Sequence, residues 1–421
     1  MRKVLQPNYV PKFTCIASNC EDTCCSGWRV AIDKESYDKY QDAVQKDGDE
    51  LFRSKITRKD VMEVEGSFAE TVLSDNTCSF LTEKKLCSIQ KMYGESYLSV
   101  TCGIFPRIYN MVNGKLELAM DMSCPHAVLL ALLNPNPMQF SLIDKDEDTR
   151  ISKISTLNLS DGKYPDEVYP YFEKLRTFTL SLLQNRNYTF ENRLIILGKF
   201  CNDLNQMYTN SNSDEVIMLI KKYTYIIDNY GFNKIISTIP KQPAALLKTL
   251  VILIEYRLKS SVTSKRFLEC FEQFKQGLNY TNEMSDEDLA ALYMQVKSNY
   301  YDNFMSQHEY IFENYFVNYV FKNIFPFGQK ISIYKKETFK VPKTVFTEFM
   351  FIVTHYAMIK NLLVGIAGYN KEQFGEQHII RLIQSFCKNI EHDIPYLQTL
   401  LKFFHDNKMI NFPCAAMLIK N

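Results

Sequence analysis

The chain has 421 residues with 49 basic and 48 acidic side chains, which leave a formal net charge of +1. This balance supplies no bulk charge for holding nucleic acid or an anionic membrane, so we expect neither as a partner. With only 14 glycines beside 26 tyrosines and 29 phenylalanines, the composition is typical of packed helices and argues against a sandwich, a solenoid or a disordered scaffold.

The amino-terminal sequence MRKVLQPNYVPKF has basic residues but no apolar run of signal-peptide length. The most apolar later stretches are interrupted, one by Lys248 and another by His355, Lys360 and Asn361. A transmembrane helix needs about 20 nearly continuous apolar residues, so we expect none. The protein is therefore expected to be soluble and cytoplasmic.

The first 135 residues combine the patterns of short strands and short helices, and their turn and cap residues set the expected boundaries. A stretch rich in Asn, Asp, Ser and Pro follows and predicts a linker over 136–165, with a short strand pair around Phe140–Ile154. The elements expected before it are a strand over 28–32, a helix capped by Asp33 and running through Val44, a strand or hairpin around Gly66 within 61–73, a short helix over 87–93 that stops at Gly94, and a helix from Cys124 to the NPNP turn.

Asn113-Gly114 separates two strand-like runs, which is a strong signal for a two-residue type I′ hairpin. If the strands pair outward from this turn, Cys102 and Cys124 meet at the open end of the hairpin, unless Pro106 ends the pairing early. The hairpin therefore predicts a shared neighbourhood for two cysteines that are far apart in sequence.

Beyond residue 165 a 3.6-residue apolar period dominates, so we expect a helical domain over 166–421. Ser213 and Ser285 are expected N-caps because acidic residues follow them. The fold class is thus mostly α, with a small Cys-rich α+β metal-binding region over 1–135 followed by a larger all-helical domain. The predicted helices cover 168–185, 190–208, 214–229, 243–259, 264–276, 286–305, 308–323, 343–366, 372–391 and 395–407.

Eight of the 12 cysteines fall within the first 124 residues, whereas the other four are widely spaced in apolar helical stretches and are expected to be buried. Disulfides require an oxidising compartment, and chance burial of eight thiols in one small segment is a weak explanation. Zinc or an iron–sulfur cluster needs soft thiolates at short spacings, so metal ligation is the favoured interpretation. The eight are Cys15, Cys20, Cys24, Cys25, Cys78, Cys87, Cys102 and Cys124.

The local spacing C-x4-C-x3-C-C differs from the C-x3-C-x2-C loop on which radical chemistry with S-adenosylmethionine usually rests, and from paired C-x2-C zinc knuckles. The chain has no G-x-G pair, no phosphate loop and no H-E-x-x-H zinc site. Its six histidines are never closer than 13 residues apart in sequence. Because these ligand motifs are absent, the cysteines are the main indication of the protein's chemistry.

Three blocks, FTCIASNCEDTCCSGWRVAID, CSFLTEKKLCSIQKMYGESYLSVTCGIFPR and GKLELAMDMSCP, resemble the flagellin lysine-N-methylase family, and the helical segment ENYFVNYVFKNIFPFG is similar too. The resemblance implies methyl transfer from S-adenosylmethionine to lysine ε-amines of flagellin. It also implies a [4Fe-4S] cluster held by the amino-terminal cysteines. The spacing does not choose between polar and radical transfer. The expected metal ligands are Cys20, Cys24, Cys87 and Cys102 first, then Cys15, Cys25, Cys78 and Cys124.

Lysine methylation requires a deprotonated amine, aromatic or carboxylate groups for the sulfonium donor, and reactants held at near-attack distance. Tyrosine-rich helices between residues 286 and 322 are compatible with a lysine channel, but a packed aromatic core is the favoured interpretation. The candidates near the cysteines are Trp28 and Asp33 for the donor, and Tyr93, Glu95, Tyr97 and Arg107 for substrate or catalysis. For each, a structural role is the favoured alternative: packing over the metal site for Trp28, a helix cap for Asp33, core or surface positions for Tyr93, Glu95 and Tyr97, and an ion pair for Arg107.

A hypothesis from a different class remains open, because thiolates also serve structural sites. In it, zinc or a cluster braces a non-catalytic module that binds another protein. Iron with acid-labile sulfide favours the enzyme, whereas stoichiometric zinc without iron favours the binding module.

Overall fold

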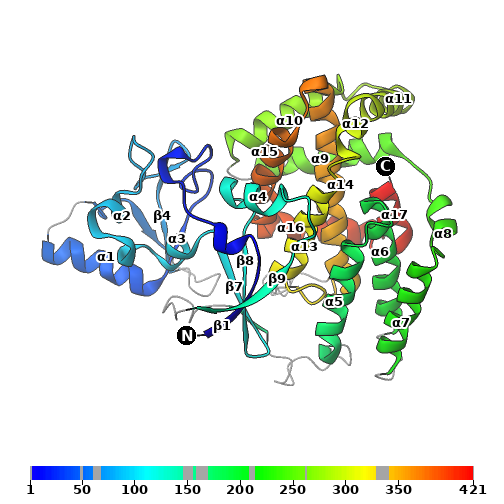
Figure 1. The fold of residues 1–421 in the computed structure, drawn as a ribbon. Helices are drawn as coiled ribbons and strands as arrows, with labels where there is room; N and C mark the ends of the chain where they lie inside the picture. Colours follow the sequence, from blue (N-terminus) through cyan, green and yellow to red (C-terminus); the bar gives the residue numbers. More distant parts are fainter. Residues whose placement is uncertain are drawn as a thin grey trace.

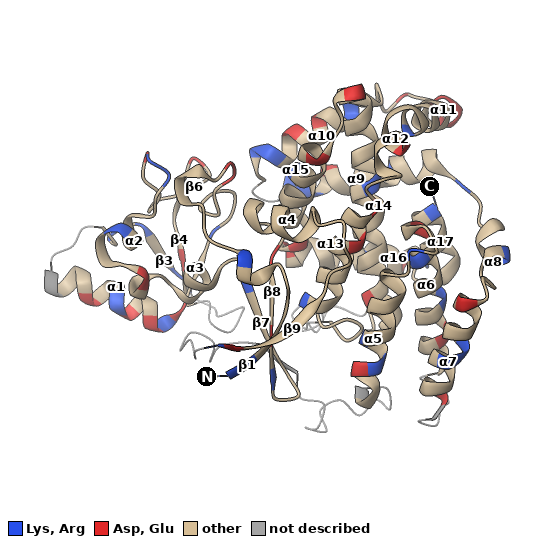
Figure 2. Cartoon of the chain, in the orientation of Figure 1, with Lys and Arg blue, Asp and Glu red and all other residues tan. Residues whose placement is uncertain are grey.

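The computed structural model describes residues 2–47, 51–59, 68–145, 155–157, 169–207, 214–260, 263–328 and 341–420. Over these residues the protein is mostly helical, which confirms the predicted fold class. Figure 1 shows a small lobe around α1 and α2 beside a larger body built from a sheet and many helices. Figure 2 shows acidic and basic residues interspersed along α1 and around α10 and α15.

The small lobe combines short strands with three short helices around its own hydrophobic core. The core side chains include Tyr40, Phe52 and Phe80, and the Tyr40 and Phe52 rings stack with centroids 4.4 Å apart. Antiparallel pairing gives one sheet in the order β2-β4-β3 and a separate β5–β6 ribbon. The elements are β2 (Ala31–Ile32), α1 (Lys34–Asp47), β3 (Ile56–Arg58), β4 (Ala69–Thr71), β5 (Leu73–Ser74), β6 (Thr77–Cys78), α2 (Ser88–Tyr93) and α3 (Val100–Ile104).

A five-stranded sheet in the order β10-β7-β8-β1-β9 lies against the helical body. Its amino-terminal strand runs parallel to β8 and antiparallel to β9, and sequence reasoning missed it. The expected strand near residue 140 is present but pairs with β1, and a partner within 146–154 falls outside the described residues. The strands are β1 (Arg2–Pro7), β7 (Arg107–Val112), β8 (Lys115–Met120), β9 (Phe140–Lys145) and β10 (Ser155–Leu157).

The β7–β8 hairpin confirms the Asn113-Gly114 turn. Its ladder ends at the pair Arg107↔Met120, so the pairing stops at Pro106, the alternative that the sequence left open, and does not reach the cysteines. Beyond that pair the chain enters α3 on one side and, on the other, an Asp121 turn that precedes α4 (Pro125–Leu132). Cys102 and Cys124 consequently belong to different parts of the molecule.

The helical body follows the predicted helices closely. Two of the predicted helices contain π-helical turns, at Lys297–Tyr301 and Cys387–Glu391. Two short helices, α8 (Asn233–Ser237) and α17 (Phe412–Lys420), were not predicted. The helices are α5 (Phe172–Leu183), α6 (Phe190–Met207), α7 (Asp214–Asp228), α8 (Asn233–Ser237), α9 (Pro243–Ser260), α10 (Lys265–Gly277), α11 (Asp286–Val296), α12 (Asp302–Met305), α13 (Tyr310–Lys322), α14 (Val345–Asn370), α15 (Glu376–Phe386), α16 (Ile394–Asp406) and α17 (Phe412–Lys420).

The central helix α14 is the longest and is buried along most of its length. The segment Val345–Gln373 is long and apolar enough to cross a membrane, but its most apolar window lies wholly inside the protein. Polar side chains on this helix are also buried, and Lys360 is paired there with Glu191. The rest of the protein therefore covers the apolar surface of this helix.

The hydrophobic cores divide the molecule in two. One core is confined to the small lobe, and the other joins the five-stranded sheet to the helical body. The larger core includes Val4, Phe13 and Cys124 from the first 135 residues. The predicted linker over 136–165 remains a prediction. The Gly66 turn and the Ser213 cap lie outside the described residues, whereas Ser285 caps α11 as predicted.

Candidate functional site

Four cysteines gather in the small lobe, and we call them the lobe thiols: Cys25, Cys78, Cys87 and Cys102. The Cys78 N–H donates to the Cys25 carbonyl at 2.8 Å. Cys87 forms a bridge with Leu81, three residues after Cys78, and precedes α2. Cys102 lies in α3, whose N-cap Ser99 accepts from the Cys102 N–H. Cys25, Cys78 and Cys87 thus lie in or against the small-lobe core, and Cys102 interacts electrostatically with all three. The exposed Cys24 lies beside this group, and its hydrogen bond to Cys25 is the main cause that raises the pKa of the Cys25 thiol.

A second group lies where the sheet meets the helical body, and we call it the body thiols: Cys15, Cys20 and Cys124. Burial raises the pKa of the Cys124 thiol to about 11, the backbone N–H groups of Ala127 and His126 oppose the shift, and Cys20 and Cys15 add to it. Cys15 is exposed and Cys20 half-buried. The two groups separate cysteines that stand only five residues apart in sequence, Cys20 and Cys25.

The lobe thiols influence one another electrostatically. Burial raises the pKa of the Cys102 thiol to about 12, and Cys25, Cys87 and Cys78 raise it further. Cys102 itself keeps exposed surface. The lobe thiols therefore lie near enough to one another to interact electrostatically.

Within the described ranges, no three His, Cys, Asp or Glu side chains are gathered closely enough to form a metal site. The lobe thiols nevertheless match the donor chemistry of zinc and of iron–sulfur clusters, since each is a soft thiolate donor. Backbone N–H groups of Gln90 and Ile89 at the start of α2 favour the charged form of Cys87, although burial, the larger cause, raises its pKa. Coordination by this set requires its side chains to move toward one another.

Asp33 lies at the start of two helices. Its carboxylate accepts from the Ser36 N–H at 3.0 Å and the Ser36 hydroxyl at 2.8 Å, which caps α1. It also accepts from the Val100 N–H at 2.9 Å, at the start of the helix that carries Cys102. The residue predicted to contact the donor therefore positions one of the lobe thiols.

The other predicted contacts belong to two different surroundings. Tyr93 and Tyr97 stack with centroids 4.6 Å apart against the small-lobe core, with Glu95 between them in a 3₁₀ turn. Arg107 lies elsewhere, with its guanidinium 5.3 Å from the Phe13 ring. The structure therefore brings the two tyrosines together but separates Arg107 from them.

Trp28 lies at the contact between the small lobe and the helical body. Its Nε1–H donates to the Cys24 carbonyl at 2.6 Å. Its ring meets His392 edge-on at 5.1 Å and Phe105 edge-on at 5.7 Å between centroids. The Lys388 ammonium lies 5.8 Å from the same ring. The single tryptophan thus bridges the cysteine loop and the second π-helical turn.

A buried charge network lies next to this tryptophan. Asp121 accepts from Lys322 at 3.0 Å and contacts His392 at 2.9 Å. Lys322 also pairs with Glu391. Burial alone would raise the pKa of Asp121, but His392 and Lys322 lower it well below its usual range. The Asp121 carboxylate is therefore ionised at neutral pH and faces an imidazole.

The cysteine loop is fastened to the helical body by polar contacts. Lys388 donates to Asp22 at 3.0 and 3.1 Å and to the Thr23 carbonyl at 3.0 Å. Gln384 donates to the same carboxylate at 2.8 Å. These contacts hold the loop that carries Cys20, Cys24 and Cys25 against α15.

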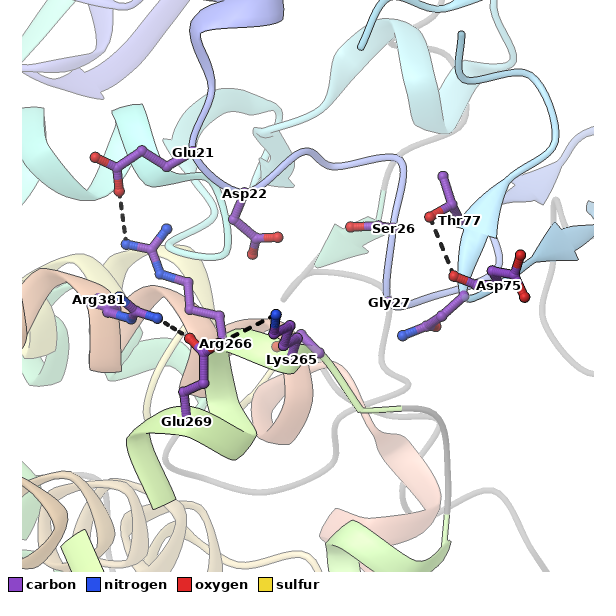
Figure 3. Close-up of a pocket in the computed structure, with 12 residues that line it drawn as sticks. Glu21, Asp22, Ser26, Gly27, Asp75, Thr77, Lys265, Arg266, Glu269 and Arg381 are labelled. Atoms are coloured by element: carbon purple, nitrogen blue, oxygen red, sulfur yellow. Dashed lines mark hydrogen bonds and ion pairs between the residues drawn. The ribbon is translucent and has the colours of Figure 1, made fainter. Parts of the chain in front are cut away.

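A cleft of about 390 Å³ opens between this loop and helices α10 and α15. Figure 3 shows Glu21 of the loop paired with Arg266 of α10, and Arg381 of α15 paired with Glu269 of α10 on the helical side. Its lining is polar and carries charges of both signs. The cleft is chemically suited to polar, zwitterionic groups rather than to an apolar ligand.

A second pocket of about 240 Å³ lies inside the helical body. Tyr301, Met305 and Phe312 from the predicted aromatic segment line it, together with Lys360. Tyr293 and Tyr315 from the same segment are fully buried in the core. The aromatic helices therefore build mainly a packed core, with one small pocket at its edge.

Sequence reasoning missed Asp121 and His392 as a pair. The histidines are far apart along the chain, and 271 residues separate this histidine from its aspartate. The one available signal was an acidic residue directly after an apolar strand, just ahead of Cys124. Long-range pairing of this kind leaves no local pattern.

Comparisons with known proteins agree on one group of relatives. Residues 176–418 match the model of the FliB lysine N-methylase C-terminal domain. A lysine-N-methylase of Salmonella typhimurium is 23% identical over 405 residues, which cover 93% of this chain and 92% of the relative. A lysine-N-methylase of Salmonella choleraesuis is 23% identical over 410 residues with the same coverage.

A shorter relative matches only part of the chain. The flagellar biosynthetic protein FliU of Salmonella muenchen is 28% identical over 142 residues, which cover 32% of this chain and 80% of the relative. No solved structure matches the chain.

Proposed function

Because the chain belongs to the FliB lysine N-methylase family, we propose that it transfers methyl groups from S-adenosylmethionine to lysine side chains of flagellin. Membership makes the chain a protein-lysine N-methyltransferase. The observation that carries the proposal is similarity to two lysine-N-methylases over 93% of the chain. The flagellar name of the shorter relative supports flagellin as the substrate.

Methyl transfer to a lysine side chain has three requirements that the protein must meet. A lysine ammonium with an ordinary pKa of about 10.4 must lose its proton before its nitrogen attacks a methyl group. The donor's sulfonium is favoured by aromatic faces and carboxylates. The two reactants must also meet at near-attack distance. The Trp28 and Phe105 rings, beside the ionised Asp121, are groups of the required kind.

We further propose that the lobe thiols hold the [4Fe-4S] cluster. The grouping of Cys25, Cys78, Cys87 and Cys102 in the small lobe supports this set. It moves Cys25 and Cys78 ahead of Cys20 and Cys24, which sequence spacing ranked first. When bound through four thiolates, such a cluster supplies electrons or braces the lobe, since no iron is left open for the donor. The body thiols then stay outside the cluster.

The proposed reaction belongs to a reducing compartment. All 12 cysteines are free thiols, and the proposed ligands must stay reduced to bind metal. We therefore place the protein in the cytoplasm, where newly made flagellin is available to it.

The test is methyl transfer by anaerobically reconstituted protein. Flagellin and S-adenosylmethionine with a labelled methyl group are incubated with the enzyme, and mass spectrometry locates the label. Label on flagellin lysines supports the proposal. The same reaction with flagellin whose lysines have been blocked by acetylation is the control and should give no label. Absence of transfer from protein that contains iron and sulfide would overturn the proposed function.

A further inference from the structure

A histidine–aspartate pair lies where the small lobe meets the helical body. His392 follows the second π-helical turn, and its Nε2 lies 2.9 Å from Oδ1 of Asp121. The aspartate is buried, whereas the histidine side chain is 37% exposed. Over the part of the chain that the structure describes, the other ring nitrogen, Nδ1, has no hydrogen-bond partner. A partly exposed imidazole is thus held against a buried carboxylate.

The aspartate is held from several sides. Its Oδ2 accepts from Lys322, and its Oδ1 also accepts from the Ser123 N–H at 2.9 Å. These partners fix the carboxylate, and the carboxylate in turn fixes which nitrogen of the imidazole faces inward. The arrangement resembles the orienting role of an aspartate behind a catalytic histidine, in which the imidazole exchanges protons through its other nitrogen.

An aromatic wall stands next to the imidazole ring. The Trp28 ring meets the His392 ring edge-on, and the Phe105 ring stands edge-on to Trp28. The Trp28 indole is anchored by its bond to the Cys24 carbonyl. Aromatic faces attract ammonium and sulfonium cations and also pack against an aliphatic stem. Both parts of a lysine side chain therefore find suitable groups here.

We propose that His392 is the general base that accepts the proton of the substrate lysine, with Asp121 as its positioning residue and Trp28 and Phe105 as the wall along which the lysine stem lies. This inference rests on the proposed function. The lysine N–H bond breaks and the proton moves to Nδ1. The freed electron pair forms the N–CH₃ bond while the sulfonium S–CH₃ bond breaks and leaves its pair on the thioether sulfur. The imidazolium then loses its proton to solvent.

Charged groups from several elements face this histidine. Asp121 follows β8 and Lys322 ends α13, while Lys388 and Glu391 come from the π-helical turn. Asp393, the next residue, pairs with Arg257 of α9 at 2.9 Å. The direct contact is anionic, so the imidazolium formed by proton transfer is stabilised where it arises.

The experiment compares His392→Gln with His405→Gln, a matched control because His405 is exposed and lies 3.4 Å from an aspartate carboxylate. Methyl transfer to flagellin is measured from pH 6 to pH 10 under single-turnover conditions. Loss of a general base typically costs roughly 10²–10⁴-fold in rate. We expect His392→Gln to lose about 10²-fold in the single-turnover rate constant at neutral pH, with the protein concentration for half-maximal rate nearly unchanged, and His405→Gln to match the wild type.

The pH profile separates a base from a structural role. The defect should shrink as the pH approaches about 10, because solvent then deprotonates lysine without help. Added imidazole should partly restore His392→Ala but not an Asp121→Asn variant. Equal activity of His392→Gln and His405→Gln at every pH would refute the general-base role of His392 but not the proposed methyltransferase activity. A pH-independent defect without imidazole rescue would refute that role too, and absence of transfer by the wild type would overturn both proposals.

Discussion

Lys388 lies 3.0 Å from Asp22, so a π-helical turn near the carboxyl end of the chain holds the cysteine loop near its amino end. The lysine side chain is 1% exposed and the aspartate side chain 12% exposed. Gln384 donates to the same carboxylate from one turn earlier. The family-matched helical region and the cysteine-rich region are therefore joined by a buried ion pair, which makes their packing testable by substitution.

Breaking that ion pair should strongly destabilise the protein. Lys388→Ala leaves a buried carboxylate without its cation, and losses of about 3–5 kcal/mol are typical of such changes. The comparison is Lys402→Ala, whose partner Asp406 lies on the surface, with side-chain exposures of 67% and 51%. That variant should lose less than about 1 kcal/mol. Denaturant unfolding measures the free energy of unfolding of both variants. Equal losses would show that the buried Lys388–Asp22 pair contributes no more than a surface pair.

Gly27 should resist substitution more than another glycine with positive φ. Its φ is +81°, and an added Cβ would lie 3.3 Å from the Lys388 Cε and 3.5 Å from the Ser264 Cβ. Gly114 in the hairpin has φ +76° with nothing within 4 Å. The left-handed backbone destabilises both alanine variants by roughly 1–2 kcal/mol. Only Gly27→Ala also brings an added Cβ against Lys388 and Ser264. We expect a lower unfolding midpoint for Gly27→Ala, and a lower midpoint for Gly114→Ala would contradict the packing described.

Asp33→Ala should destabilise the small lobe, because one carboxylate serves the starts of α1 and α3. Loss of an N-cap typically costs about 0.5–2 kcal/mol. Asp38→Ala is the control, since that residue lies exposed on α1 and pairs only with Lys34 among the described residues. Thermal unfolding should place Asp33→Ala below Asp38→Ala. Coincident transitions would mean that the α3 contact contributes nothing.

Acid should weaken the junction through Asp121. Its pKa is lowered in the folded protein, so its ionised form stabilises the fold above the unfolded value of about 3.9. This contribution is lost as the pH falls through the lower, folded-state pKa. Asp121→Asn should therefore be less stable than the wild type at pH 7, and the difference should narrow below about pH 4. Urea unfolding at a series of pH values measures the difference in the free energy of unfolding between the two proteins. A difference that does not change with pH would contradict an ionised, paired Asp121 carboxylate.

Periodic patterns predicted the helical body well, since an apolar stripe at a 3.6-residue spacing identifies a helix whatever it packs against. The Asn113-Gly114 turn was predictable for a similar reason, because two residues determine its geometry. The strand β1 was missed, because a short amino-terminal segment with two basic residues gains its strand from its neighbours β8 and β9. The π-helical turns also left no signal in the apolar period.

The site was less predictable than the fold. Sequence spacing ranked Cys20 with Cys24, Cys87 and Cys102. In the structure Cys20 lies with Cys15 and Cys124, whereas Cys102 lies with Cys25, Cys78 and Cys87. Spacing likewise said nothing about Asp121 and His392, whose contact joins the turn after β8 to the residue that follows the π-helical turn Cys387–Glu391. Chemistry that depends on packing between distant segments becomes visible only once the fold is known.

Iron and acid-labile sulfide per chain, measured on anaerobically reconstituted cysteine variants, test the central claim most directly. Serine at position 25, 78, 87 or 102 should each deplete iron and the visible colour of the cluster. Serine at 15, 20, 24 or 124 should retain most of the wild-type iron, and Cys414→Ser, a substitution in the distant helix α17, should retain all of it. Folded wild-type protein that binds no iron, or depletion by the body thiols and not by the lobe thiols, would contradict the account.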